Sequence, residues 1–141
     1  MSDTVQTLRY LPPTTIRVVA DQQGRDHASL LPHELIGQGL EAVPPETAAH
    51  IVRSEEATLR TLVAVAEELA ATQASTILKG AHTQTRDNLS TEINRLKALR
   101  RVNPNIREDE IEHLESHWQI LSRVLDTAKP RPDAIRVIVD T

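Results

Sequence analysis

Two histidines are the residues of this chain whose spacing could support metal chemistry. His113 and His117 stand four positions apart, which places both imidazoles on one face of a helix, where they can share a metal ion. A zinc site needs at least three protein ligands, and the sequence offers no obvious third one. Glu115, between them, does not occupy the position of the catalytic glutamate of zinc proteases. We interpret both as solvated histidines beside a helix seam, and keep a metal-dependent enzyme as an alternative.

Other catalytic motifs are not recognisable in the sequence. The four glycines never precede a Lys-Ser or Lys-Thr pair, so there is no phosphate-binding loop, and no serine has the flanking glycines of a nucleophile elbow. The acidic run from Asp109 to His113 superficially resembles a helicase box, but it opens a helix instead of following a strand. We therefore predict that this chain has no catalytic residue, no cofactor and no metal.

A basic group is the main candidate for a partner contact. It consists of Arg95, Lys97, Arg100, Arg101 and Arg107. An acidic group lies beside it, with Glu108, Asp109, Glu110, Glu112 and Glu115. We favour pairing of the two groups within the fold, because the compensating charges are adjacent in sequence. The alternative is that the basic group meets an acidic protein face or nucleic acid. The net charge of -4 and the single Trp and Tyr argue against direct nucleic-acid binding.

Composition fits a reducing, aqueous compartment. There is no cysteine, so disulfides and thiolate zinc sites are excluded. The first residues lack the basic and apolar stretches of a signal peptide, and the longest apolar run, Leu62 to Ala66, is too short to span a bilayer. We expect a single cytoplasmic domain over residues 1–141 that makes no membrane contact.

The spacing of apolar residues predicts three long helices, at about 46–79, 81–102 and 106–128. Leucine, isoleucine, valine and alanine recur at steps of three and four, as on one helix face. These positions are Leu59, Leu62, Val63, Ala66, Leu69 and Ala70, then Leu89, Ile93, Leu96 and Leu99, then Ile111, Leu114, Trp118, Leu121 and Leu125. Gly80 is the expected break between the first two helices. We assign Trp118 to the seam, with an exposed anchor for a partner as the alternative.

The last two helices are expected to fold back on each other as an antiparallel hairpin. They are nearly equal in length, and the short link between them contains Pro104. Folding back also brings the basic group against the acidic group. The alternation of three and four in the last helix indicates a coiled-coil seam.

Two similar β-branched runs predict strands at 16–21 and 134–140. Antiparallel pairing would place Arg17 opposite Asp140 and Asp21 opposite Arg136, whereas parallel pairing would oppose like charges. The predicted fold is therefore α+β and mainly α, with a helical hairpin and terminal strands paired antiparallel.

Several segments resemble the C-terminal end of RapA-type ATPases, bacterial members of the Swi/Snf family. The most specific one runs from Ile93 to Ile111 and contains Val102-Asn103-Pro104-Asn105-Ile106-Arg107. The others are Leu8 to Thr14, Ile16 to Val19 and Arg131 to Val139. The sequence departs from the family pattern at Pro132, where an aliphatic residue is usual, and in stopping at Thr141.

The resemblance implies a function in transcription. The family couples ATP hydrolysis to recycling of RNA polymerase, with an ATPase motor N-terminal to the matched region, and the matched region is a non-catalytic domain with long helices. The expected partners are bacterial RNA polymerase, the N-terminal ATPase region of a parent protein, or both. The alternative is a stand-alone coiled-coil scaffold or dimerisation module, and self-association is left open.

Overall fold

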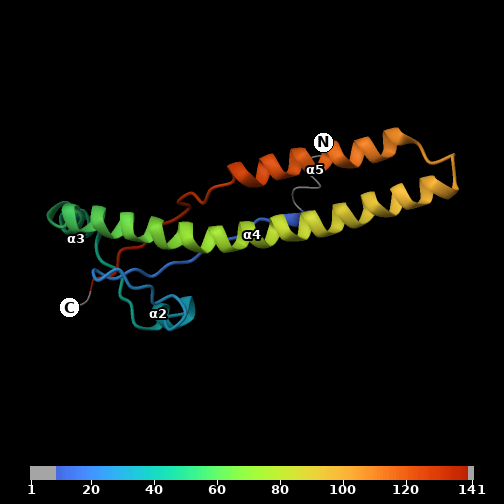
Figure 1. The fold of residues 1–141 in the computed structure, drawn as a ribbon. Helices are drawn as coiled ribbons and strands as arrows, with labels where there is room; N and C mark the ends of the chain where they lie inside the picture. The colour runs from blue at the N-terminus through green and yellow to red at the C-terminus, as the bar shows by residue number, and fades with distance from the viewer. Residues whose placement is uncertain (1–8, 140–141) are drawn as a thin grey trace. The chain divides into compact units, whose positions relative to one another are not determined.

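The computed structural model describes residues 9–139. Its helices are α2 (His33–Gln38), α3 (Pro45–Ser54), α4 (Glu56–Val102) and α5 (Glu108–Thr127) (Figure 1). The chain divides into two compact units, one of residues 1–15 with 74–141 and one of residues 16–73. We call them the hairpin unit and the 16–73 unit. Whether residues 1–141 act as one domain stays a prediction. Within the described residues, no helix is both long enough and apolar enough to cross a membrane.

The hairpin unit is built from the C-terminal part of α4 and from α5, which run antiparallel (Figure 1). Three polar side-chain contacts connect the two helices in the order that antiparallel packing requires. His82 Nε2 lies 3.1 Å from Asp126 Oδ1, Lys97 Nζ lies 3.1 Å from Glu115 Oε1, and Arg100 Nη2 lies 3.3 Å from Glu108 Oε2. The predicted fold-back of the last two helices, and the meeting of basic and acidic side chains that it causes, are therefore observed.

A small apolar core lies between these two helices. Its buried cluster joins Tyr10, Leu89 and Leu121, with Leu114 and Trp118 packed against it. The buried residues of α4 and α5 in this unit are Ala74, Ala81, Thr85, Leu89, Ile93, Ile111, Leu121 and Leu125. They are separated by four, seven or ten residues, which are sums of steps of three and four, and this keeps them on one face of each helix. The small residues among them allow the two backbones to approach.

The break in the long helix lies at Glu55, not at Gly80. Helix α3 ends at Ser54 and α4 then runs without interruption from Glu56 to Val102, through Gly80. Glycine costs only about 1 kcal/mol relative to alanine inside a helix, and the good helix formers on both sides of Gly80 offset that cost. The expected pair of helices at 46–79 and 81–102 is thus replaced by a short α3 and one long α4.

The predicted α+β fold with paired terminal strands is wrong. Residues 9–139 contain no strand, only an isolated antiparallel bridge between Ala20 and Asp26. The run 16–21 is held instead by the loop that follows it. Asp26 Oδ1 accepts a hydrogen bond from the Val19 amide, and the Arg17 guanidinium donates to the carbonyl oxygens of Ala28 and Leu31.

The expected pairing of Asp21 with Arg136 across two strands is not formed. Asp21 accepts from Arg25 and His27 instead of Arg136, and Asp140 lies outside the described residues. The physical reason is that a two-stranded ribbon is marginal in water, whereas a short loop can satisfy the polar groups of residues 17–21 locally. The second run, residues 134–139, is not a strand and exposes Ile135, Val137, Ile138 and Val139.

Candidate interaction surface at the hairpin tip

The link between α4 and α5 forms a tight turn, and we call residues 99–108 the hairpin tip. The Asn103 amide donates to the Leu99 carbonyl oxygen at 2.8 Å, which closes the last turn of α4. The Asn103 side chain then accepts from the Asn105 amide at 3.0 Å, and the Asn103 carbonyl oxygen accepts from Ile106. Pro104 cannot continue a helix after Asn103, so the chain reverses here.

Three of the five basic candidate residues are used inside the fold. Arg95 pairs with Glu92 one turn away, and the bond from Arg95 holds the pKa of the Glu92 carboxyl below its usual range. Lys97 and Arg100 bind Glu115 and Glu108 across the hairpin. Lys97 and Arg100 therefore position the two helices relative to each other, and the Arg95 pair supports α4 itself.

The two remaining basic residues, Arg101 and Arg107, are available to a partner. Both are exposed at the hairpin tip, and neither side chain forms an ion pair or hydrogen bond within residues 9–139. Acidic groups lie close by, because Glu108 belongs to the tip, and Asp109 and Glu110, which follow it in the first turn of α5, have no ion pairs within the described residues. The hairpin tip is thus a surface of mixed charge and not a basic patch.

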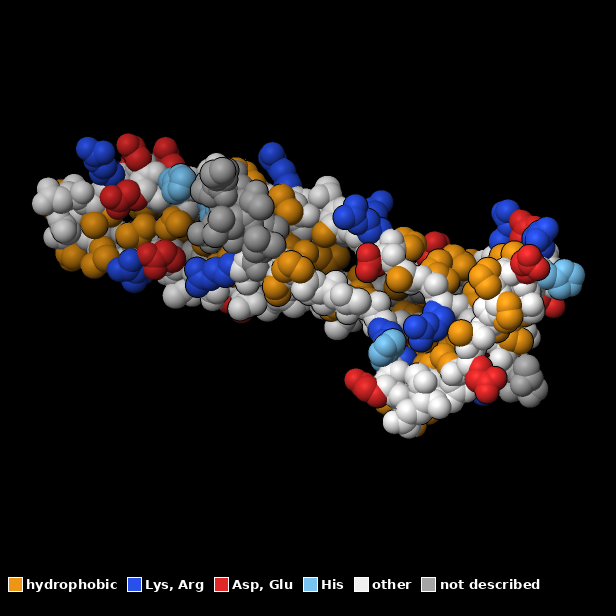
Figure 2. All heavy atoms as spheres, turned by 180° about the vertical axis from the view of Figure 1, so that it is seen from behind, with side chains coloured by type: hydrophobic (Ala, Val, Ile, Leu, Met, Phe, Trp, Pro, Cys, Tyr) orange, Lys and Arg blue, Asp and Glu red, His pale blue; other side chains and the backbone are white. Residues whose placement is uncertain are grey.

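Apolar side chains lie beside these free cations. Val102 is 81% exposed and Leu99 is 38% exposed. Leu99 continues the apolar stripe of α4, but α4 ends three residues later and Leu99 stays partly exposed. Figure 2 shows the molecule from behind, with basic, acidic and apolar side chains close together at the hairpin end. Sequence periodicity alone could not reveal this exposure, because it depends on where the partner helix begins.

The two candidate metal-binding histidines lie on α5 with their rings stacked. The ring centroids of His113 and His117 are 6.4 Å apart and the planes differ by 10°. Within residues 9–139 no group of three or more potential ligand residues gathers around any point. The stacked pair therefore has no third ligand there, and the Asp109–His113 run lies in the first turns of α5.

The Asp21 carboxylate organises the loop 21–27 through a set of hydrogen bonds that the sequence pattern did not predict. Asp21 Oδ2 lies 2.9 Å from Arg25 Nε and 2.7 Å from His27 Nε2, and Asp21 Oδ1 accepts the amides of Gln23 and Arg25. The hydrogen bond from His27, and then those from Arg25, hold the pKa of the Asp21 carboxyl far below its ordinary value. Gly24, with φ of +80°, makes the turn that brings these groups together. These hydrogen bonds fix a loop, and the groups show no arrangement for catalysis.

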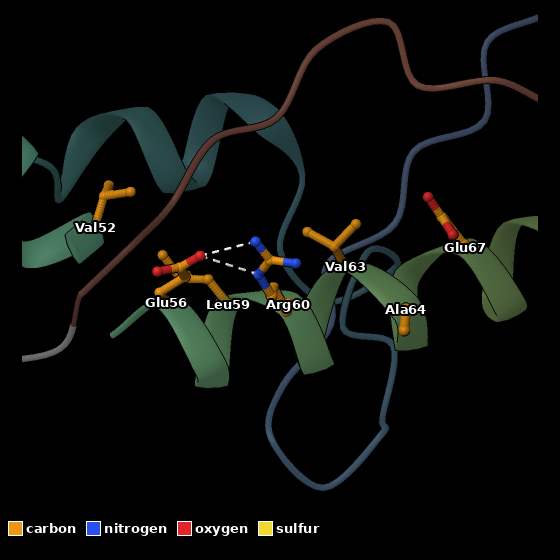
Figure 3. Close-up of a pocket in the computed structure, with 7 residues that line it drawn as sticks. All are labelled: Val52, Glu56, Leu59, Arg60, Val63, Ala64 and Glu67. Carbon is orange, nitrogen blue, oxygen red and sulfur yellow. Dashed lines mark hydrogen bonds and ion pairs between the residues drawn. The ribbon is translucent and has the colours of Figure 1, made fainter. Parts of the chain in front are cut away.

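The 16–73 unit carries a shallow apolar hollow where α3 meets α4 (Figure 3). Val52, Leu59, Val63 and Ala64 supply its apolar lining. Arg60 binds Glu56 through two hydrogen bonds to one carboxylate oxygen, and Glu67 lies further along α4. Nothing in this lining offers a nucleophile or a base aimed at a common point.

These features define a class of protein, namely a helical hairpin domain with an exposed tip of mixed charge and no recognisable catalytic arrangement in the described residues. Comparison with known proteins identifies the family. Residues 2–140 match the sequence model described as RNA polymerase recycling family C-terminal, and the chain belongs to this family.

Individual relatives agree with this assignment. The chain is 38% identical over 137 residues to the RNA polymerase-associated protein RapA of Erwinia tasmaniensis, and 39% identical over 137 residues to those of Yersinia pestis and Yersinia pseudotuberculosis. Each match covers 97% of this chain and 14% of the relative. The chain therefore spans about one seventh of the length of these relatives.

Proposed function

We propose that this chain is a non-catalytic docking domain that associates with bacterial core RNA polymerase and uses the hairpin tip to do so. Support for the partner comes from the family, which is described by RNA polymerase recycling, and from relatives described as RNA polymerase-associated. In this proposal any ATP hydrolysis belongs to other parts of a longer protein, and the domain works in the cytoplasm with the polymerase.

The exposed hairpin tip is the observation that carries the proposal. Val102 and Leu99 offer apolar area that stabilises an interface when it is covered. Arg101 and Arg107 flank them without partners of their own in the described residues. An arginine beside an apolar anchor is a common composition for the centre of an interface.

The remaining basic residues have a different role in this proposal. Lys97 and Arg100 keep α4 and α5 in register, and Arg95 binds Glu92 within α4, so that together they hold the tip in one geometry. A preformed tip loses less conformational entropy on binding than a flexible loop would. All five basic residues thus contribute to docking, but only Arg101 and Arg107 touch the partner.

A second candidate partner is the N-terminal ATPase region of a longer parent protein. The 14% coverage of the relatives favours it, because most of their length lies outside the matched part. A stand-alone scaffold is a third possibility, and it would require self-association of the kind argued in the next subsection. Direct nucleic-acid binding is disfavoured by the net charge of -4 and by the absence of an aromatic platform.

Binding to core RNA polymerase, measured by surface interferometry, tests the proposal. We expect a double variant, Arg101→Glu with Arg107→Glu, to weaken binding by at least about tenfold, because two attractive contacts become repulsive. The matched control is Arg123→Glu with Arg131→Glu, which makes the same change of net charge at exposed positions outside the tip. The wild-type affinity should also fall between about 50 mM and about 300 mM salt. Equal affinities of the two double variants would remove the tip from the interface.

A further inference from the structure

The 16–73 unit has no buried core of its own. None of its residues is buried, and the buried apolar residues of the described chain belong to the hairpin unit. Apolar side chains that remain partly in contact with water gain free energy when another surface covers them. The hollow between α3 and α4 is where such a surface would fit.

One edge of α4 borders this hollow and carries both apolar and charged side chains. Leu59 and Val63 are half-buried in its lining, and Arg60 and Glu67 are exposed in the same lining (Figure 3). Arg60 uses Nε and Nη2 to bind Glu56, so Nη1 remains without a hydrogen bond, and Glu67 has no ion pair within the described residues. The edge therefore displays one cation and one anion that are about two helical turns apart.

We propose that this edge of α4 is a self-association surface that takes a second copy of the same chain, packed antiparallel. Ala66 and Ala70 are half-buried and continue the face of Leu59 and Val63 along α4, beyond the hollow. In the antiparallel arrangement Leu59 of one copy meets Ala70 of the second copy, and Val63 meets Ala66 of the second copy. Each layer then pairs a large side chain with a small one, which fills space without overpacking. The two-fold symmetry of such a dimer repeats every layer.

The charges agree with the same register. Antiparallel packing brings Arg60 of one copy opposite Glu67 of the second copy, and symmetry makes this pair occur twice. Parallel packing would instead set Arg60 beside Arg60 and Glu67 beside Glu67, which is repulsive. The sequence of this edge is therefore complementary to itself in one orientation only.

Sedimentation velocity of the full chain over a concentration series is the first test. The seam is short, so we expect a weak dimer with a Kd on the order of 100 µM. The sedimentation coefficient should rise with concentration across that range. A chain that sediments as a monomer at every concentration up to about ten times that Kd overturns the proposal.

Charge reversal identifies the surface and its orientation. Arg60→Glu and Glu67→Lys should each raise the Kd by at least about tenfold, because both symmetric pairs become repulsive. An equimolar mixture of these two variants should associate again. In the mixed dimer the introduced glutamate of the first variant faces the introduced lysine of the second, and the native Glu67 of the first faces the native Arg60 of the second. The double variant Arg60→Glu with Glu67→Lys should also self-associate.

Matched controls separate this effect from a general change of charge. Glu68→Lys changes the same charge one residue away, on the exposed side of α4, and Arg123→Glu does so on α5. Both should keep the wild-type Kd, and circular dichroism should show unchanged helix content in every variant. Failure of the mixture to restore association, or equal loss in the controls, overturns the proposal. These outcomes do not depend on polymerase binding, so this proposal and the proposed function can fail separately.

Discussion

Truncation of one buried leucine gives a quantitative test of the hairpin core. Leu121 on α5 is 1% exposed and belongs to the buried cluster with Tyr10 and Leu89. Leu121→Ala removes roughly three methylene equivalents at about 0.8 kcal/mol each, or about 2.4 kcal/mol of transfer free energy. A residual cavity adds to this, and we expect a total loss near about 3 kcal/mol in the free energy of unfolding. That loss is a large share of the roughly 5–15 kcal/mol that stabilises a typical domain.

Urea denaturation followed by circular dichroism measures this loss, and thermal unfolding should show a fall in Tm of about 10 °C. The matched control is Leu99→Ala, which makes the same substitution in a helix at a side chain that is 38% exposed. Helix propensity changes equally in both variants, so the difference between them reports burial. We expect the control to cost less than about 1 kcal/mol. Equal losses in the two variants would refute the assignment of Leu121 to the core.

Two further predictions concern α4 and the loop 21–27. Gly80→Ala should raise the free energy of unfolding by about 0.5–1 kcal/mol in urea denaturation, because Gly80 lies inside a helix and an added Cβ meets no atom within 4 Å; an unchanged or lower value would mean that α4 is broken there. The depressed pKa of Asp21 means that its charged form stabilises the folded loop above the unfolded pKa, and that this contribution is lost as pH falls through the folded value. Asp21→Asn should therefore lower Tm relative to wild type at about pH 6 and lose that difference as the pH falls below about 4, and a difference independent of pH would contradict the role of the charge.

The helical part of the fold follows from sequence pattern and elementary energetics. Steps of three and four locate the faces of α4 and α5, and Pro104 fixes where the chain turns back. The adjacency of basic and acidic groups anticipates the Lys97–Glu115 and Arg100–Glu108 pairs. The expected helix break at Gly80 does not occur, because the helix-propensity cost of one glycine is smaller than the free energy gained by continuing the helix.

The strands could not be decided from pattern alone. A β-branched run such as residues 16–21 favours extended backbone, but pairing depends on which polar groups satisfy that backbone. Here Asp26 accepts the Val19 amide and the Arg17 side chain binds two carbonyl groups of the following loop. Those contacts come from side chains at irregular spacing, which periodicity does not register.

The candidate site was only partly predictable for a similar reason. The sequence identifies the five basic residues, but it does not say which of them form ion pairs within the fold. That depends on the register of α5 against α4, which leaves Arg101 and Arg107 free within the described residues and exposes Val102. The exposure of an apolar residue at a helix end is decided by its neighbours in space.

The most direct test of the central claim is photo-cross-linking from the hairpin tip to core RNA polymerase. A benzophenone side chain is introduced at position 102 in the full chain, and in a second variant at position 124, where Val124 is exposed on α5 away from the tip. Docking through the tip predicts a covalent adduct with a polymerase subunit from position 102 and little from position 124. If the chain binds the polymerase but cross-links equally from both positions, or from position 124 alone, the account of the tip as the docking surface is contradicted.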